Sequence, residues 1–150
     1  MADGFKPTLA VVFISIKQDR KAVCEILNNY GIDIIGATSC GEFINGSQTK
    51  GEIAVMLLEV STESFAIHFE NIGQRSIQEV SREIAKNAHA KFTNPALIIC
   101  STGVNRNGEF FHGEALVRNL EEALGSQRLF FGGMAGDDMT LTGSYVFTKG

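Results

Sequence analysis

The sequence is poor in the features that mark several large protein classes. Its 13 Lys and Arg residues are outnumbered by 17 Asp and Glu residues, and the resulting net charge of −4 is not interrupted by a basic cluster. Nucleic-acid binding requires basic side chains that neutralise phosphates, so no DNA or RNA partner is expected. No apolar run is long enough to cross a bilayer. The short run Leu9–Ile16 follows an acidic residue and has no cleavage-site pattern, so we interpret it as a strand rather than a signal peptide.

Cysteine is also scarce. The three cysteines, Cys24, Cys40 and Cys100, are odd in number and have no CxxC spacing, which argues against a disulfide framework and against a structural zinc site. A reducing cytoplasm is the simplest location for such a chain. The sequence also has neither a GxGxxG nor a GKS/T motif, so nucleotide binding is disfavoured.

The length and composition are those of one compact domain. A chain of 150 residues with 44% hydrophobic and 20% charged residues can bury a sizeable core, and no stretch reads as a flexible linker. We therefore expect a single domain over residues 1–150.

The chain contains the same succession of elements twice. Each copy has a strand, a helix, a second strand that leads into a glycine-rich turn, and a closing strand. In the first copy these are Leu9–Ile14, Lys21–Tyr30, Ile32–Ile35, Gly36–Glu42 and Ile53–Leu58. In the second copy they are Ala96–Cys100, Glu114–Leu124, Leu129–Phe131, Gly132–Asp138 and Ser144–Phe147. This repetition predicts a site that is built from two related halves.

Apolar spacing and capping residues predict the helices. The first helix carries an apolar stripe at Val23, Ile26, Leu27 and Tyr30, and Gly31 is placed to end it. The third helix has a stripe at Val117, Leu120 and Leu124, and Gly125 follows it. Between the copies, a capping box of Ser76 and Glu79 begins a second helix, which ends before Asn94–Pro95.

The alternation of Phe65, Ile67 and Phe69 with more polar residues predicts an antiparallel strand that forms a hairpin with Ile53–Leu58. Asn45–Gly51 and Gly103–Gly113 are expected to be loops. The predicted order is β-α-β-β-β-α-β-α-β-β. It describes an α/β fold with a mixed β-sheet and packed helices, built from two related β-α-β-β units.

The two glycine-rich turns are the first candidate site. Such turns expose backbone N–H groups, and ligands of open α/β sheets lie at the carboxyl ends of strands. The alternative is that the glycines serve only the geometry of the turns. Their carboxylates, Glu42, Asp137 and Asp138, either pair with an ammonium group of a ligand or accept N–H groups of the turns themselves.

Three further side chains are candidates. Arg106, which neighbours Asn105 in the polar loop Ser101–Gly108, either binds a carboxylate through its guanidinium group or is a solvated loop charge. Cys40 would be a nucleophile only if neighbouring N–H groups activated it, and no histidine occupies a motif-like position to act as its base. His112, beside the polar loop, is the histidine that we consider as a haem ligand or a pocket contact.

The stretches Ile34–Glu42 and Phe130–Asp138 resemble the two hallmark turns of the FIST domain, the F-box and intracellular signal transduction module. The intervening strands and their spacing are similar too, so the resemblance covers nearly the whole chain. The GG-x-AGD element is the more specific of the two motifs. The positions that the resemblance carries over are Cys40, Gly41, Glu42, Gly132, Gly133, Ala135, Gly136 and Asp137.

This resemblance implies a cytoplasmic sensory domain of bacterial type that binds a small molecule, with amino acids proposed as ligands, and that is not an enzyme. Members of the family are usually joined to histidine kinases, cyclic-dinucleotide enzymes or chemotaxis receptors, and they continue into a C-terminal FIST half. We therefore expect the chain to be part of a longer signalling protein, with a C-terminal FIST half and an output domain as partners. The pocket would be incomplete without that half.

In the leading hypothesis, the two turns and the Asn105–His112 loop form the ligand pocket. Arg106 and turn N–H groups hold a carboxylate of the ligand while Asp137 holds its amine. No metal and no cofactor is expected, although a haem-based gas sensor with His112 as the iron ligand is a competing hypothesis. Two more hypotheses are a cysteine-dependent enzyme that uses Cys40 and a protein-interaction module without a small ligand.

Overall fold

The computed structural model describes residues 4–105, 107–125 and 128–149. Within these residues it has the predicted mixed α/β architecture, with three helices and a mixed sheet. The chain divides into two compact units, each of which is described separately. Unit 1 comprises Met1–Phe65, Cys100–Phe111 and Met134–Gly150, and unit 2 comprises Ala66–Ile99 and His112–Gly133. The expected single domain over residues 1–150 stays a prediction.

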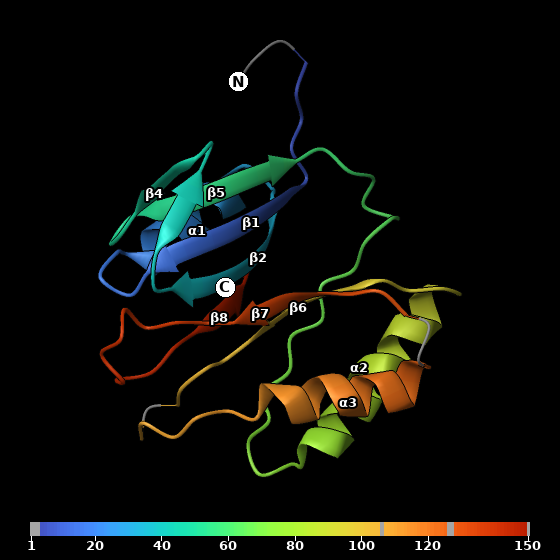
Figure 1. Cartoon of the computed structure of the whole chain (residues 1–150). Coiled ribbons are helices and arrows are strands. Elements are labelled where there is room, and N and C mark those ends of the chain that lie inside the picture. The colour runs from blue at the N-terminus through green and yellow to red at the C-terminus, as the bar shows by residue number, and fades with distance from the viewer. Residues whose placement is uncertain (1–3, 106, 126–127, 150) are drawn as a thin grey trace. The chain divides into compact units, whose positions relative to one another are not determined.

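A four-stranded mixed sheet forms the centre of unit 1 (Figure 1). Its order is β5 (Ile53–Leu58), β1 (Leu9–Ser15), β2 (Asp33–Ser39) and β8 (Val146–Thr148). Strands β1 and β2 run parallel, so that Ser15 lies opposite Ser39 at their carboxyl ends, whereas β5 and β8 pair antiparallel at the two edges. Helix α1 (Arg20–Asn29) supplies the crossover between the two parallel strands.

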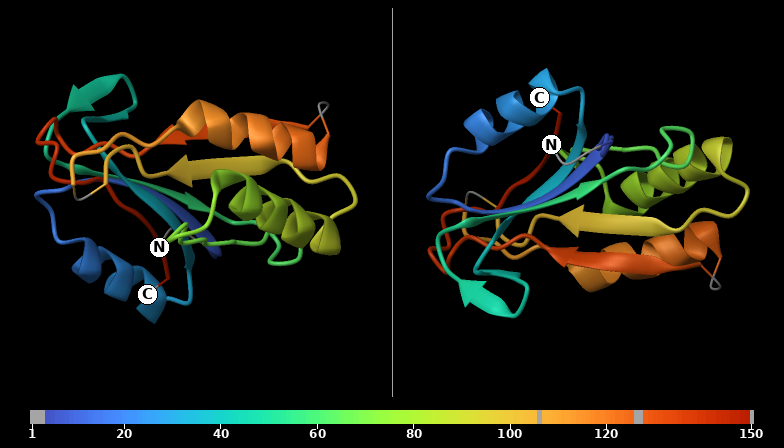
Figure 2. Two further views of the ribbon diagram at one scale, coloured as in Figure 1. Left: turned by 90° about the horizontal axis from the view of Figure 1, so that it is seen from below. Right: turned by 90° about the horizontal axis from the view of Figure 1, so that it is seen from above.

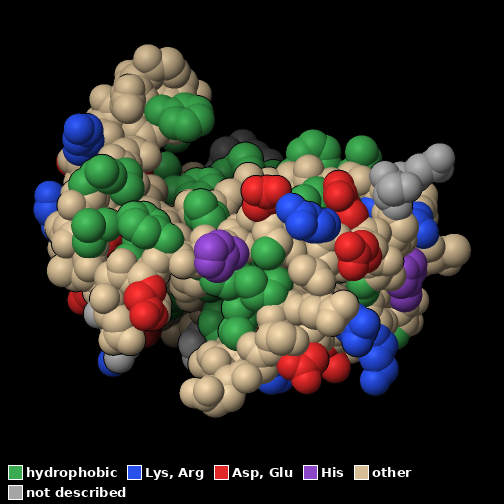
Figure 3. All heavy atoms as spheres, turned by 60° about the horizontal axis from the view of Figure 1, so that its bottom comes forward, with side chains coloured by type: hydrophobic (Ala, Val, Ile, Leu, Met, Phe, Trp, Pro, Cys, Tyr) green, Lys and Arg blue, Asp and Glu red, His purple; other side chains and the backbone are tan. Residues whose placement is uncertain are grey.

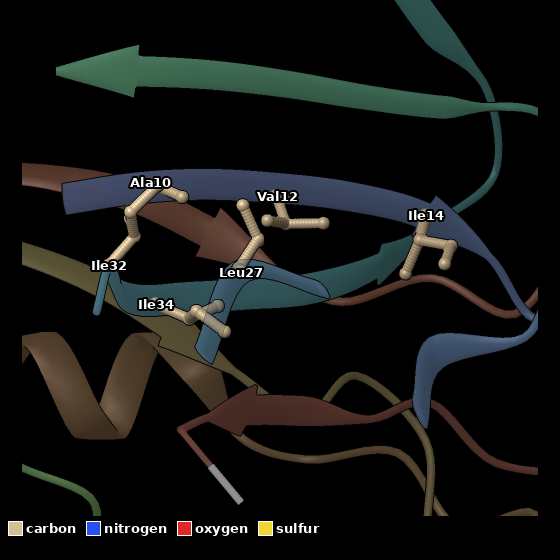
Figure 4. Packing of buried hydrophobic residues seen from close by; sticks show 6 residues of the cluster. All are labelled: Ala10, Val12, Ile14, Leu27, Ile32 and Ile34. Atoms are coloured by element: carbon tan, nitrogen blue, oxygen red, sulfur yellow. The ribbon is translucent and has the colours of Figure 1, made fainter. Parts of the chain in front are cut away.

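The core of unit 1 lies between this sheet and α1. Alternate residues of β1, Ala10, Val12 and Ile14, are fully buried and pack with Ile32, Ile34 and Leu27 (Figure 4). The period of two puts these β1 side chains on one face of the strand. Burial of each large aliphatic side chain contributes about 1.5–3 kcal/mol, so this cluster fixes the positions of the two strand ends that follow it.

Helix α1 begins and ends within one residue of the predicted bounds, but the side of the helix that faces the core differs from the predicted one. The Asp19 side chain caps its first turn, and Gly31 follows its end with φ of +70°. Leu27 is buried, whereas Ile26 and Tyr30 are 58% and 65% exposed. Because α1 covers only part of the sheet, a narrower stripe of Val23, Cys24 and Leu27 meets the core.

The first glycine-rich turn was expected to begin at Gly36, but β2 continues as far as Ser39. A Cβ atom on Gly36 would lie 2.3 Å from the Phe147 ring, so the glycine makes room for a side chain of β8. The Arg20 guanidinium carbon lies 5.7 Å from the centre of the Phe147 ring and 4.5 Å from that of Tyr145, which precedes β8. Gly36 therefore serves packing rather than a turn.

The loop predicted at Asn45–Gly51 is largely a β-hairpin. Strands β3 (Glu42–Ile44) and β4 (Ser47–Thr49) pair antiparallel around Asn45 and Gly46, which have φ of +50° and +81°. An Asn-Gly pair favours this two-residue turn because both positions require a left-handed backbone. The dipeptide was the sequence signal for a hairpin, and the loop prediction was wrong.

Unit 2 contains two helices that pack against each other, α2 (Ile77–Lys91) and α3 (Gly113–Leu124). The capping box of Ser76 and Glu79 is confirmed, and α3 ends at Gly125, which has φ of +95°. The residues that α2 and α3 bury are Val80, Ser81, Ala85, Leu116, Leu120 and Leu124. Val117, which was expected in the stripe, is 40% exposed.

Strands β6 (Leu97–Ser101) and β7 (Phe130–Met134) begin in unit 2, pair with each other and point the same way (Figure 2). The Leu97 N–H group bonds to the Leu129 carbonyl near the start of this pair. The second glycine-rich turn was expected from Gly132, but β7 includes both Gly132 and Gly133.

The predicted strand Phe65–Phe69 is wrong, because residues 65–72 belong to no strand and no hairpin with β5 forms. In unit 2 this segment is held by side chains instead. His68 contacts Glu70 at 2.8 Å and Asn87 of α2 at 3.0 Å, and Arg75 bonds to Glu70, which lowers the pKa of that carboxyl group. Alternation in a sequence predicts which residues share a face, but it does not specify a pairing partner.

Candidate functional site

The first glycine-rich stretch and the unit 1 part of the second lie against each other. The Gly136 N–H group bonds to the Thr38 carbonyl at 2.8 Å, and the Thr38 hydroxyl donates to the Gly136 carbonyl at 2.5 Å. A Cβ atom on Gly136 would lie 2.4 Å from the Cys40 sulfur, so only glycine fits here without a shift. The second stretch therefore lies against the carboxyl end of β2.

Thr38 holds two points of the chain at once. Besides Gly136, its backbone N–H group donates to the Tyr145 carbonyl at 2.8 Å, and its hydroxyl oxygen accepts from the Tyr145 N–H group at 2.9 Å. Its side chain is 2% exposed. This one residue thus anchors both ends of the loop formed by residues 137–143, which we call the 137–143 loop.

Asp138 ties the same loop to β1. The Ser15 hydroxyl, at the carboxyl end of β1, donates to Asp138 Oδ2 at 2.5 Å, and Lys17 Nζ lies 3.8 Å from the same oxygen. The Asp138 side chain is 8% exposed, whereas that of Lys17 is 68% exposed. Among the described residues, no hydrogen-bond partner contacts the second carboxylate oxygen of Asp138, Oδ1. We call Ser15, Thr38, Cys40, Gly136 and Asp138 the strand-end cluster.

Asp137 is engaged within its own loop. Its Oδ2 atom accepts hydrogen bonds from the N–H groups of Thr142 at 2.8 Å and Gly143 at 3.3 Å, and from the Thr140 hydroxyl at 3.2 Å. Burial alone would raise the pKa of Asp137, but the N–H groups of Gly143 and Thr142 and the Thr140 hydroxyl hold it below its usual value. The carboxylate therefore shapes the loop by accepting its N–H groups.

The other positions of the first stretch surround Cys40. Glu42 is buried, and its carboxylate accepts from the Ser39 hydroxyl at 2.5 Å and from the Glu52 N–H group at 3.1 Å. Gly41 lies against β4, where a Cβ atom would come within 3.3 Å of the Thr49 carbonyl oxygen. The Cys40 residue itself is exposed. Glu42 and Gly41 thus support the position of Cys40, and Cys40 is the accessible side chain of this stretch.

The polar loop after β6 lies beside the 137–143 loop in unit 1. The Ser144 hydroxyl oxygen accepts from the N–H groups of Gly103 at 2.7 Å and Val104 at 3.0 Å. Asn105 closes a turn, because its Oδ1 atom accepts from the N–H groups of Asn107 and Glu109. Ala135 is buried and bonds to the Ser101 carbonyl at 2.7 Å. Arg106 lies outside the described residues.

Three predicted site residues, Gly132, Gly133 and His112, belong to unit 2. Gly132 has φ of +139°, and a Cβ atom there would lie 1.9 Å from the Ile99 carbonyl oxygen. A Cβ atom on Gly133 would meet no atom within 4 Å. His112 is exposed and precedes α3 without a side-chain capping bond. Gly132 therefore has a structural reason to be glycine, since it lets β6 and β7 approach each other.

Sequence reasoning missed Ser15, Thr38 and Ser144, the three hydroxyl residues that join these segments. Ser15 and Thr38 bond to residues about a hundred positions away in the chain, so no local pattern marks them. The available signal was their location, because Ser15 and Thr38 are polar residues at the ends of otherwise apolar strands.

No group of three or more His, Cys, Asp or Glu side chains in the described part of the chain is arranged to hold a metal ion. On the face shown in Figure 3, Lys and Arg side chains lie among acidic and hydrophobic ones. None of the described helices combines the length and the apolar character that a membrane span requires.

A family model described as the FIST N domain matches residues 8–150. No curated protein and no solved structure matches the chain. The match includes both glycine-rich stretches and every residue of the strand-end cluster.

Proposed function

Because the chain belongs to the FIST N domain family, a family of sensory domains in signal transduction, we propose that it binds a small molecule at the strand-end cluster and performs no catalysis. One observation carries this proposal. The two family stretches, which lie far apart in the sequence, are joined by the hydrogen bonds between Thr38 and Gly136 at the carboxyl ends of parallel strands. That edge of an α/β sheet is where ligands usually bind.

We further propose that the ligand carries an ammonium group, as an amino acid does. Our expectation from the sequence was that Asp137 holds the amine, but the Oδ2 atom of Asp137 already accepts three hydrogen bonds. Asp138 fits this role better, since its Oδ1 atom has no partner among the described residues. A carboxylate with one free oxygen can add a charge-assisted hydrogen bond to an ammonium group.

As a sensor, the domain would act on an output domain or partner protein, which we propose to be a kinase, a cyclic-dinucleotide enzyme or a chemotaxis receptor in the cytoplasm. A ligand shifts such an output only if it binds one conformation more tightly than the other. A shift from 1:99 to 99:1 requires a preference of about 5.5 kcal/mol. The 137–143 loop is the segment of the site through which we expect this preference to arise.

The test is a thermal-shift screen of the purified chain against amino acids, the matching carboxylic acids without the amine, the matching amines without the carboxylate, and hemin. A specific ligand at about a hundred times its dissociation constant should add about 2.7 kcal/mol, which raises the Tm by several degrees. The expected result is a shift with amino acids and a smaller one with their amine-free analogues.

The variant that tests the site is Asp138→Asn, with Asp33→Asn as the matched control. Asp33 is an exposed carboxylate at the amino end of β2 and pairs with Lys149 at 3.6 Å. The ligand-induced shift should disappear in Asp138→Asn and persist in Asp33→Asn. Equal shifts in both variants would remove the strand-end cluster from the proposal. A shift with hemin alone, abolished by His112→Ala, would replace the amine ligand by haem.

A further inference from the structure

The 137–143 loop contains an unusual concentration of left-handed backbone. Asp138, Met139 and Leu141 have φ of +55°, +63° and +55°, and among the described residues the only other such non-glycine residue is Asn45 in the hairpin turn. This region is unfavourable for a residue with a Cβ atom, most of all for a bulky one. Met139 is 81% exposed and Leu141 is 50% exposed, so their own burial offsets little of the strain.

The ends of this loop are fixed, in contrast to its middle. Thr38 bonds to Gly136 before the loop and to Tyr145 after it, and Ser144 bonds to the N–H groups of Gly103 and Val104. Glycines lie at both boundaries, Gly136 and Gly143, and Gly143 has φ of +122°. Fixed ends with glycine next to them allow the segment between them to change its backbone angles without moving the sheet.

One side chain ties the middle of the loop to β1. Asp138 Oδ2 accepts the Ser15 hydroxyl at 2.5 Å, and Lys17 approaches the same oxygen. The remaining hydrogen bonds of the loop are internal. The N–H groups of Thr142 and Gly143 and the Thr140 hydroxyl bond to Asp137, and the Thr140 and Thr142 hydroxyls bond to each other. These internal bonds hold the loop in its left-handed shape, but they do not attach it to the strands.

We propose that residues 137–143 form a strained lid over the carboxyl ends of β1 and β2, held shut by the bond between Asp138 and Ser15. On opening, Asp138, Met139 and Leu141 leave the left-handed region, the hydrogen bonds to Asp137 break, and the hinges at Gly136 and Gly143 absorb the change. A ligand ammonium group that binds Oδ1 of Asp138 and draws the carboxylate away from the Ser15 hydroxyl would release the lid. The ligand that would lie under the lid rests on the proposed function, but the motion of the lid does not.

The first test measures amide hydrogen exchange of the ligand-free full chain and its Ser15→Ala variant. The N–H groups of Thr142 and Gly143 should exchange at least tenfold faster in the variant, because the tether that favours the closed lid is absent. The N–H groups of Gly136 and of the central residues of β1 and β2 should be unchanged. Exchange of Thr142 and Gly143 within twofold of the unsubstituted chain would overturn the proposal.

The second test measures the strain itself and does not depend on Ser15. Met139→Gly and Met139→Ala remove the same exposed side chain, so their difference reports the backbone. At a left-handed position glycine should give the higher Tm, by about 2–4 °C, and slower exchange of Thr142 and Gly143. Ser64 is an exposed loop residue without a positive φ and is the matched control, where alanine should be at least as stable as glycine.

A Met139→Gly variant that is no more stable than Met139→Ala would show that the loop is not strained, and the lid proposal would fail. Both tests use the ligand-free protein. A chain that binds no amine can therefore still have the lid, and a chain that binds one can lack it.

Discussion

Thr38 is the single residue on which the geometry of the site depends most. Its backbone pairs with β1 and bonds to Tyr145, which precedes β8, and its hydroxyl bonds to Gly136 and Tyr145. A buried hydroxyl in this role donates to one backbone group and accepts from another, so its loss costs more than the net value of one hydrogen bond.

Replacement of Thr38 by Val keeps the shape of the side chain and removes the hydroxyl. We expect the free energy of unfolding to fall by about 2–4 kcal/mol, because the Gly136 carbonyl and the Tyr145 N–H group both lose a partner. Urea denaturation measures this difference. Thr38→Ser keeps the hydroxyl and should lose only about 1 kcal/mol, so an equal loss in both variants would contradict the argument.

Asp137 should make the stability of the chain depend on pH in acid. Its pKa is lowered in the folded state, so the unfolded chain binds the proton more tightly and protonation favours unfolding. Its contribution is complete above the unfolded pKa of about 3.9 and is lost as the pH falls through the folded pKa. The difference in urea midpoint between the unsubstituted chain and Asp137→Asn should be constant at neutral pH and shrink below about pH 4. A difference in urea midpoint that grows in acid would show that the pKa of Asp137 is not lowered by folding.

At the scale of the elements, β7 contains two neighbouring glycines, of which only one is required by the packing of the backbone. Gly132 has a positive φ and faces the backbone of β6, where a Cβ atom would lie 1.9 Å from the Ile99 carbonyl oxygen. Gly133 has open space at the same atom. A backbone atom cannot move aside as a flexible side chain can, so only Gly132 is needed for the pairing of β6 and β7.

We therefore expect Gly132→Ala to lower the free energy of unfolding by about 3 kcal/mol or more, since it adds a steric overlap to an unfavourable backbone conformation. Gly133→Ala should change it by less than about 1 kcal/mol. Chemical denaturation of both variants, followed by circular dichroism, makes the comparison. Equal effects of the two substitutions would mean that the pair is required for another reason.

The elements also show which parts of the fold can be predicted from the sequence. Gly31, Gly125 and the Ser76–Glu79 capping box placed the helix ends to within a few residues, because caps act through bonds to nearby backbone groups. The strand expected at Phe65–Phe69 failed because pairing needs a partner edge. The exposure of Ile26 and Tyr30 likewise depends on how much of the sheet α1 covers.

For the site, the sequence singled out the two stretches, and the structure brings their unit 1 residues together through Thr38 and Gly136. That the stretches are related copies stays a prediction. The sequence did not predict that Asp137 and Asp138 have different roles. Adjacent carboxylates look equivalent in a sequence, and their roles differ because one accepts N–H groups of its own loop while the other reaches Ser15.

At the level of the whole molecule, the chain passes repeatedly between the two units. Strands β6 and β7 each begin in unit 2 and end in unit 1. A strand is a cooperative element, so the loss of its pairing at one end weakens the other. Neither unit is formed by one continuous segment of the chain.

We accordingly expect both units to unfold in one transition. The chain has no tryptophan, and its two tyrosines, Tyr30 and Tyr145, lie in unit 1, whereas the two longer helices, α2 and α3, lie in unit 2. Tyrosine fluorescence and helical circular dichroism therefore report different units in the same urea titration. Coincident curves are expected, and separated midpoints would show that the units unfold independently.

The hydrogen bonds of the strand-end cluster join segments that are synthesised at very different times. Ser15 and Asp138 are 123 residues apart in the chain, and Thr38 and Gly136 are 98 apart. Contacts over such separations are slow to form, and synthesis proceeds from the N-terminus. Strands β1 and β2 can pair on the ribosome while the segment that completes their edge has yet to be made. A nascent chain therefore cannot complete the strand-end cluster until Gly136 and Asp138 have been made and have left the ribosome.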